Sequence, residues 1–421
     1  MKFLLTSVGS AGDIHPFVAI GRELAARGHD VWLLVNPYFE QTVRSAGLGF
    51  LPLGDEFDFK QKMNVPNAAH PRKGSMTVLR ELLIVDAPII INATQSALER
   101  VKPDAVIAHH ISIGTPWLCE RMRIPLITAV LAPALWFNDR DKCVYAQGAP
   151  ENPPRWLMQA GMWLARRQMR WMYDRPVNRI RRDLGFAPAR DMIFADATRG
   201  ALVLGMWSPH FRAPMPGDPP TGVICGFPWH DDSPRLGTDA VDVLRFLDEC
   251  DAANDPPLLF TLGTAIVHVA GNFYEHAAQA CRALGRRGIL LTNRKEYAPA
   301  SLPSGVRAFH YAPFSHVMPR CAAVVHHGGI GTTAQGLRSG RPTLIVPHAY
   351  DQFDNAARAK RLGVSRTLWA TRLNLQRLAA ELRALVDDST VVSRADSLGK
   401  RISSEAGTAA AANHVESFMR H

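Results

Sequence analysis

The sequence predicts an α/β protein of two domains, each a parallel sheet covered by helices, which face each other across a cleft. Runs of strand-forming residues alternate with helical periodicity, a pattern typical of parallel sheets with helices on both faces. This pattern occurs before residue 226 and starts again after the Pro- and Asp-rich stretch 226–234. With 421 residues, 47% of them hydrophobic, the chain can form two or three domains with a substantial core.

The first unit opens with a strand, a turn, a helix and a second strand. Lys2–Val8 is the first expected strand and 9–13 the turn. Pro16 suits the first turn of a helix, and Gly28 is placed to end that helix. Further strands are expected at Val31–Val35, Ala105–Ala108 and Leu126–Leu131.

The second unit repeats this alternation. Its expected strands are Leu258–Leu262, Ile289–Thr292, Ala323–Val325 and Thr343–Val346, with a helix over Phe273–Leu284. We therefore expect four parts in chain order, the last packing back on the first: an N-terminal domain over 1–225, a linker over 226–255, a C-terminal domain over 256–405 and a helix over 406–421.

The charge balance and the cysteines narrow the class of protein. Lys and Arg exceed Asp and Glu by 48 to 38, a net charge of +10 that suits an anionic ligand or surface. No Lys-rich run with interleaved aromatics indicates nucleic-acid binding. The six cysteines are scattered, which disfavours a zinc site or a disulfide framework. No apolar run reaches the ~18–20 residues of a membrane span, so we expect a cytoplasmic protein.

The segment 155–182 combines methionine with arginine. Its apolar residues recur at helical spacing (Met158, Met162, Ala165, Met169 and Met172), and arginines occupy much of the remaining surface. One interpretation is a helix packed on its own domain with a solvated basic face. The alternative is a lid over an apolar ligand, or peripheral contact with the inner face of the membrane.

The strongest candidate site is the corner 324–333, with the sequence VVHHGGIGTT. A strand ends there, small residues allow close approach of the backbone, and a helix begins whose free N–H groups favour an anion such as phosphate. The corner is neither a Walker loop nor GxGxxG. The alternative is a glycine-rich turn with two incidental histidines.

Two further segments carry polar side chains after strands. Asp351 and Gln352 could grip vicinal hydroxyls by accepting and donating hydrogen bonds, although Asp351 could equally be an ordinary helix N-cap. Asp13, in the turn after the first strand, could be a general base aimed into the cleft, or Asp13 or His15 could be the N-cap of the next helix. Together, the phosphate-binding corner at 324–333 and the hydroxyl-binding pair Asp351 and Gln352 indicate a sugar-nucleotide site.

These motifs resemble glycosyltransferase family 1. The runs HGGIGT at 327–332 and DQFDNA at 351–356 are similar to its nucleotide-sugar signature, and GSAGDIHP at 9–16 is similar to the first loop of its bacterial and sterol-type members. The resemblance extends over essentially the whole chain and is greatest to the rhamnosyltransferases of rhamnolipid biosynthesis. It implies the GT-B fold, two Rossmann-like domains with the acceptor bound by the first and the donor by the second.

The resemblance also implies a role for individual residues. Asp13 stands where many relatives carry the catalytic base, and Asp351 and Gln352 where they bind the donor sugar. The residues implied for the diphosphate are Gly12, Gly263, Thr264, His327, Gly328, Gly329, Gly331 and Thr332. Those implied for the base and ribose are Tyr311, Ala312 and Gln335, the last standing where many relatives have Glu. His15, His109 and Trp136 are candidates for the acceptor pocket, which variable loops such as 55–75 and 132–170 would build.

The implied reaction is a single inverting displacement without metal or other cofactor. Asp13 takes a proton from an acceptor hydroxyl while the nucleoside diphosphate leaves. The leading expectation is transfer from a dTDP- or UDP-sugar, dTDP-L-rhamnose first, to a 3-hydroxyalkanoyl lipid. A UDP-glucose or deoxysugar transferase acting on a sterol, lipid or polyketide is the alternative. A sugar-nucleotide epimerase and a non-catalytic partner protein on the same fold are the rivals. The DxD tripeptide at 139–141 is interpreted as a surface loop, and the oligomeric state stays open.

Overall fold

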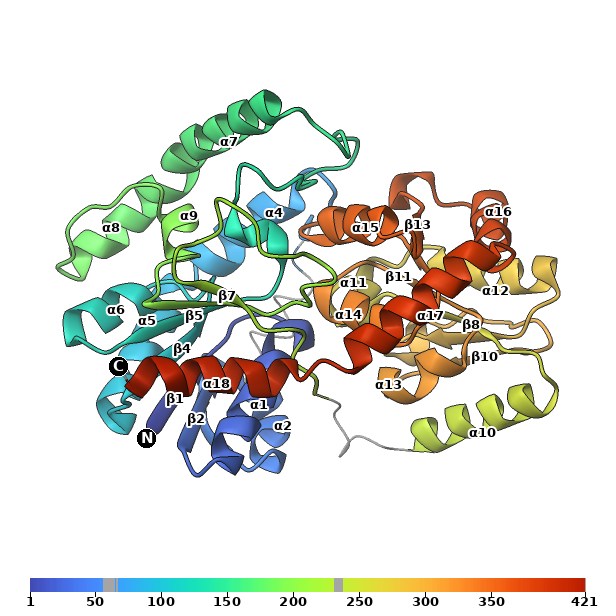
Figure 1. The fold of residues 1–421 in the computed structure, drawn as a ribbon, viewed down its shortest axis with the longest axis horizontal. Coiled ribbons are helices and arrows are strands. Elements are labelled where there is room, and N and C mark those ends of the chain that lie inside the picture. Colours follow the sequence, from blue (N-terminus) through green and yellow to red (C-terminus); the bar gives the residue numbers. More distant parts are fainter. Residues whose placement is uncertain (56–64, 66, 231–237, 421) are drawn as a thin grey trace.

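Two parallel sheets form the frame of the protein in the computed structural model, which describes residues 1–55, 65, 67–230 and 238–420 (Figure 1). The first sheet has the strand order β3-β2-β1-β4-β5-β6-β7 and the second the order β10-β9-β8-β11-β12-β13, with every pair parallel. The predicted pair of α/β domains is therefore confirmed.

The first sheet consists of β1 Lys2–Thr6, β2 Asp30–Val35, β3 Gly49–Pro52, β4 Ala105–His109, β5 Leu126–Val130, β6 Leu202–Gly205 and β7 Gly222–Ile224. The second consists of β8 Leu258–Thr261, β9 Gly288–Leu291, β10 Val306–Phe309, β11 Ala323–His326, β12 Thr343–Ile345 and β13 Ser365–Thr367. The helices of the first half are α1 Ala11–Ala26, α2 Glu40–Ser45, α4 Gly74–Thr77, α5 Ala87–Val101, α6 Thr115–Met122, α7 Arg155–Met169, α8 Arg175–Asp183 and α9 Met192–Asp196. Those of the second are α10 Thr238–Ala252, α11 Gly263–Ile266, α12 Phe273–Leu284, α13 Phe314–Val317, α14 Ile330–Arg338, α15 Gln352–Arg361, α16 Leu375–Val386, α17 Ser389–Ser403 and α18 Gly407–Arg420.

Helices cover both faces of each sheet, so the central strands are apolar on both sides. In β1, Phe3 and Leu5 pack with α1, whereas Leu4 packs with α5. In β8, Leu258 packs with α12 and Leu259 with α10. This burial explains why the central strands are continuous apolar runs in the sequence.

The first helix begins earlier than expected. Helix α1 starts at Ala11, and Pro16 lies inside it rather than in its first turn. The carboxylate of Asp13 accepts the Ser10 N–H at 2.7 Å and so supports a start at Ala11. Pro16 then removes only one helical hydrogen bond.

Two segments connect the halves of the chain. Helix α10 falls within the predicted linker 226–255 but packs with the second sheet, and residues 231–237 of that linker lie outside the described residues. Helix α18 returns to the first domain, where Ala411, Ala412 and Val415 join the core beneath α1 (Figure 1). Glu416 of α18 also pairs with Arg27 at 3.0 Å. The boundaries of the four predicted parts remain predictions.

A chain of buried ion pairs links the two domains. Arg358 of α15 pairs with Asp354 at 2.5 Å and, across the interface, with Asp141 at 2.9 Å. Asp141 also pairs with Arg212 at 3.0 Å, and Arg212 in turn pairs with Asp218. The interpretation of 139–141 as a surface loop is therefore wrong at Asp141, because this carboxylate is buried as the shared partner of two guanidinium groups.

Candidate active site

The site lies where the carboxyl ends of the two sheets face each other. Helix α1 begins after β1 and helix α14 after β11, and the two helices contact across the domain interface. A Cβ atom built on Gly331 would lie 3.8 Å from the Cα atom of Gly12. The loop 9–16 and the corner 324–333, distant in the sequence, are thus brought together with two helix N-termini converging on them.

The corner places its two histidines in different surroundings. His326 lies within β11, fully buried, and its Nδ1 accepts the Gly328 N–H at 3.1 Å. His327 is packed between two glycines: a Cβ on Gly263 would lie 2.6 Å from its Cε1, and one on Gly329 would lie 2.5 Å from its Nε2. The structure therefore places His327, and not His326, between the two glycine loops.

Both histidines are neutral at pH 7. Burial lowers the pKa of His326 to about 3, and burial together with the neighbouring His326 lowers the pKa of His327 well below its usual value. Nδ1 of His327 is buried and has no hydrogen-bond partner among the described residues. A neutral imidazole at this position can donate one hydrogen bond to an anion in the cleft.

The loop around Gly263 and Gly328 depends on conformations that favour glycine. Gly263 has φ +60° and Gly328 has φ +90°, and a Cβ on Gly328 would lie 2.7 Å from Ile345. Thr332 is buried in the first turn of α14, whereas Thr264 is exposed at the start of α11. Every predicted diphosphate residue thus lies at the carboxyl edge of one of the two sheets.

Asp13 projects from the first turn of α1. Its Oδ2 accepts hydrogen bonds from the Ser10 N–H at 2.7 Å and the Ser10 hydroxyl at 3.1 Å. Burial raises the pKa of Asp13 to about 6, although these bonds oppose the rise. The N-cap of α1 is Ser10 and Asp13 is the N3 residue of its capping box, so the expectation that Asp13 or His15 caps this helix is wrong. The side chain of Asp13 is one-third exposed, and its role as a general base stays a prediction.

His109 lies behind Asp13 rather than in the open cleft. It ends β4, is 2% exposed and packs edge-on against Phe17. Its Nε2 is 3.9 Å from Asp13 Oδ1, and burial and His110 lower its pKa well below the usual value. The ring is covered in the ligand-free chain, and the expected acceptor contact of His109 stays a prediction. No pattern in the sequence indicates that His109 lies behind Asp13.

Asp351, Gln352 and Asn355 form the second side of the site. Asp351 Oδ2 accepts a hydrogen bond from Asn355 Nδ2 at 2.7 Å, and the same amide group donates to the Gly328 carbonyl at 2.9 Å. Burial raises the pKa of Asp351 to about 7, and the negative charge of Asp13 adds to the rise. The two carboxylates therefore interact electrostatically across the domain interface.

The side chain of Gln352 has less hydrogen-bonding capacity left for a ligand than expected. Its Oε1 accepts the N–H groups of His348 and Ala349 at 2.8 and 3.1 Å, and its side chain is buried. The oxygen is thus committed to the loop, which leaves the amide N–H groups as the part that could bind a sugar hydroxyl.

Tyr350 is a site residue that sequence analysis missed. It has φ +60°, and its hydroxyl donates to the Ala68 carbonyl in the first domain. Burial, with the charges of Asp13 and Asp351, raises its pKa to about 12. Its position one residue before Asp351 was the only available signal, because a left-handed tyrosine is not recognisable from sequence.

The remaining predicted residues are dispersed. Tyr311 and Ala312 follow β10, with Tyr311 half-buried and Ala312 buried, and Gln335 lies half-buried in α14. His15 packs edge-on against His230, with ring centroids 5.2 Å apart. The expected acceptor contact of Trp136 stays a prediction.

Trp136 is 4% exposed and packs on Trp207 with ring centroids 4.6 Å apart, so its ring belongs to the core. Residues 56–64 and 66 of the predicted acceptor loop lie outside the described residues.

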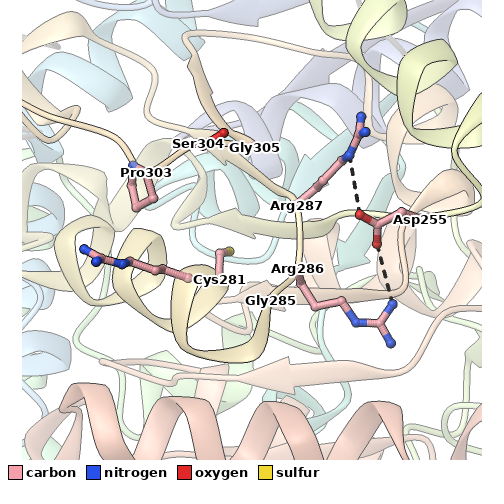
Figure 2. Close-up of a pocket in the computed structure, with 9 residues that line it drawn as sticks. Asp255, Cys281, Gly285, Arg286, Arg287, Pro303, Ser304 and Gly305 are labelled. Carbon is pink, nitrogen blue, oxygen red and sulfur yellow. Dashed lines mark ion pairs between the residues drawn. The ribbon is translucent and has the colours of Figure 1, made fainter.

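Two cavities differ in their relation to this site. A cavity of about 70 Å³ adjoins the Asp13 loop and is lined in part by Gly9, Ile14, Leu53 and Ile90. A larger one of about 510 Å³ lies at the amino ends of the second sheet, the edge opposite the site. Figure 2 shows it between Cys281, Pro303 and the arginines that pair with Asp255. The small cavity is the one placed to extend the site.

The described residues hold no group of three or more His, Cys, Asp or Glu side chains arranged for a metal ion. In the same part of the chain, no helix has the length and apolar character to cross a membrane. The expected lack of a metal and the expected cytoplasmic location remain predictions.

Comparison with known proteins identifies relatives along the whole chain. Residues 3–136 match the glycosyltransferase family 28 N-terminal domain, and residues 287–417 match the C-terminal domain of erythromycin biosynthesis protein CIII-like proteins. O-mycaminosyltylonolide 6-deoxyallosyltransferase of Streptomyces fradiae is 31% identical over 443 residues, which cover 99% of this chain and 97% of that protein. Sterol 3-beta-glucosyltransferase UGT80A2 of Arabidopsis thaliana is 28% identical over all of this chain and 66% of its own length. The crystal structure of the kitacinnamycin glycosyltransferase has a TM-score of 0.73 at 21% identity, with 99% of each chain covered.

Proposed function

The chain belongs to the GT-B glycosyltransferases, and from this premise we propose that it transfers a sugar from a nucleoside diphosphate to a hydroxyl of a large apolar acceptor, with inversion at the anomeric carbon. One observation carries the proposal. Asp13 lies in the first turn of α1, which contacts α14 after the His327 corner, and its charge acts on Asp351 at the N-cap of α15. A sugar-nucleotide site needs a base, a hydroxyl-binding carboxylate and an anion-binding corner near one another, so the proximity of these groups supports the proposal.

The residues divide the reaction between them. The acceptor oxygen attacks the anomeric carbon while its proton passes to Asp13, and the bond from that carbon to the diphosphate oxygen breaks. His327 and the first N–H groups of α14 stabilise the charge that gathers on the leaving diphosphate. Asp351 and the amide N–H groups of Gln352 hold the sugar hydroxyls. Asp13 is mostly ionised at neutral pH, since its pKa is about 6.

The finer choice of substrates rests on the relatives. The Streptomyces relative is named for a 6-deoxyallosyl group and O-mycaminosyltylonolide, and the Arabidopsis relative for a glucosyl group and a sterol. We take a dTDP-6-deoxyhexose as the first donor, of which dTDP-L-rhamnose is the member expected from the sequence, and UDP-glucose as the second. A glycosylated lactone or a sterol is the first acceptor class. The 3-hydroxyalkanoyl lipid is supported by the sequence resemblance alone.

The proposal is tested first by binding and then by turnover. A nucleotide present at ~100 times its dissociation constant stabilises the fold by ~2.7 kcal/mol. Thermal unfolding is therefore measured with dTDP, UDP and NAD in parallel, and the unfolding temperature should rise with dTDP or UDP only. An unchanged unfolding temperature with both dTDP and UDP would contradict the proposed donor site. Mass spectrometry of donor–acceptor mixtures then separates the classes: a glycosylated acceptor supports a transferase, an isomerised donor an epimerase, and binding without either product a non-catalytic protein.

A further inference from the structure

Helix α7 carries large apolar side chains on the face that points away from the protein. Trp156, Trp163, Leu164 and Trp171, which follows the helix, are each 59% to 68% exposed. No residue of α7 is buried. Figure 1 shows the helix standing clear of both sheets at the outer edge of the first domain. Such a concentration of exposed tryptophan is unusual for a surface that faces water.

The methionine stripe lies on the opposite side of the same helix. Met158, Met162 and Met169 are half-buried, and Met169 packs against the core of the first domain. Helical spacing separates the two stripes, because residues seven apart, such as Trp156 and Trp163, share a face. The stripe predicted from the sequence is thus the inner one, and the tryptophan face is a second apolar surface that the fold leaves uncovered.

The segment that carries this face is strongly basic, although Arg181 of α8 is buried against Trp117 rather than near the face. Residues 155–182 contain eight arginines and a single acidic residue, Asp174, which is buried and accepts backbone N–H groups of 191 and 192. Asp191 pairs with Arg166 and Arg170 at the edge of the face. Among the described residues, Arg155 and Arg167 make no ion pair, and Arg167 lies over the Trp163 ring at 5.9 Å.

We propose that the outer face of α7, made by Trp156, Trp163, Leu164, Trp171 and Arg167, docks the protein on the surface of an anionic lipid bilayer. Tryptophan and arginine together favour the region between headgroups and acyl chains, where the rings are desolvated and the guanidinium groups reach phosphate. A second copy of the chain fits less well, since it would bring two arginine-rich surfaces together. The helix would lie along the bilayer surface, with the cleft open to water beside a source of apolar acceptors.

The test measures vesicle binding with no substrate present, so its result is independent of the proposed transferase reaction. The full chain is sedimented with vesicles of phosphatidylglycerol and phosphatidylcholine in equal parts, and with pure phosphatidylcholine. Binding is expected to the anionic vesicles and to fall with salt. Replacing the three tryptophans together (W156S, W163S and W171S) should weaken binding by about tenfold or more, because their burial drives insertion.

Two control variants distinguish binding through this face from non-specific hydrophobic or electrostatic binding. Val241 and Val269 are also exposed but belong to the second half of the chain, so V241S with V269S should bind vesicles like the wild type. R155Q with R167Q should weaken binding by about fivefold per charge, and R155K with R167K should restore it. A far-UV circular dichroism spectrum and a thermal unfolding midpoint like those of the wild type show that each variant is folded.

Other results would overturn the proposal. They are failure of the wild type to bind anionic vesicles, equal binding by the triple variant, or a dimer in sedimentation velocity that the tryptophan changes dissolve without any vesicle binding. The last result would identify the face as an interface between proteins.

Discussion

At the residue scale, the site is governed by two carboxylates held in partly desolvated positions on different domains. Burial raises the pKa of Asp13 to about 6 and that of Asp351 to about 7. Their hydrogen bonds differ, because Asp13 accepts from Ser10 whereas Asp351 accepts from an asparagine of its own helix. Different roles for the two groups follow from these surroundings.

Asp13→Asn should abolish turnover and leave nucleotide binding nearly intact. Asparagine keeps an oxygen for the Ser10 N–H but cannot take a proton, and loss of a general base lowers the rate by about 10²- to 10⁴-fold. In the wild type, kcat/KM should rise between pH 5 and 7 with a midpoint near 6, because the pH profile of kcat/KM reports the ligand-free enzyme. Steady-state kinetics and calorimetric dTDP titration measure the two effects. Equal losses of kcat and affinity would contradict a role as base.

His109→Leu should shift that pH profile without changing dTDP affinity. The ring of His109 is the polar group behind Asp13, with Nε2 3.9 Å from Asp13 Oδ1. An apolar side chain there should disfavour the charged carboxylate, raise the pKa of Asp13 and move the midpoint of kcat/KM to higher pH. His109→Gln retains a donor and should lie closer to the wild type. An unmoved midpoint in the leucine variant would limit His109 to packing.

Asp351→Asn should stabilise the ligand-free protein at pH 8 but not at pH 4. The folded protein holds the Asp351 proton more tightly than the unfolded chain, whose aspartate pKa is ~3.9. This contribution to stability is therefore complete below pH ~4 and is lost as the pH rises through about 7. Urea unfolding should show a gain on the order of 2 kcal/mol at pH 8, allowing for partial exposure. An equal gain at both pH values would exclude the carboxylate charge as its cause.

At the element scale, the glycine loop after β8 controls the position of His327. Gly263→Ala would place a Cβ 2.6 Å from the His327 ring, and the ring has to move. Because a hydrogen bond to a charged group contributes ~1.5–3 kcal/mol, dTDP affinity should fall by about tenfold or more. The dissociation constant is measured by calorimetry.

Gly285→Ala is the matched control. Gly285 has φ +62°, nearly the same as Gly263, but a Cβ there meets open space. Both variants should lose roughly 1–2 kcal/mol of stability from backbone strain, and only the first should lose nucleotide affinity. Equal affinity in the two variants would argue against His327 as a diphosphate ligand.

The elements that could be predicted from sequence are those whose signal is local. The central strands β1, β4, β5, β8 and β11 are buried on both faces, and α12 matches its predicted range from Phe273 to Leu284. The strands missed were short ones, such as β3 and β7, whose three or four residues include glycine or proline. The outward face of α7 was also missed, because periodicity shows two stripes without showing which one the fold covers.

At the scale of the whole molecule, the two domains are held together by buried charge. Asp141 accepts from Arg212 of its own domain and from Arg358 of the other, a pairing that no local pattern could reveal. The meeting of Asp13 with Asp351 is equally long-range, because it depends on how the two sheets face each other. Sequence motifs therefore predicted both halves of the site, but not the contacts between them.

Arg358→Met should destabilise the protein by about 3–5 kcal/mol, since it leaves the buried Asp354 without its cation and Asp141 with Arg212 alone. Lys360→Met on the same helix removes an exposed pair with Glu151 across the same interface and should cost less than ~1 kcal/mol. Chemical unfolding of both variants measures the difference. Similar losses would show that the buried chain contributes no more than a surface pair.

The return of α18 to the first domain makes the second domain an insertion in the first. Residues after 406 supply part of the core under α1, so the first half of the chain is incomplete when cut before them. Recombination between relatives must therefore exchange an internal segment at two junctions, because a single crossover would seat one parent's final helix on another parent's core. A hybrid with a second domain from another relative should keep the α18 helix of the parent that supplies its first domain. Otherwise the residues at 411, 412 and 415 have to be changed to fit that parent's core.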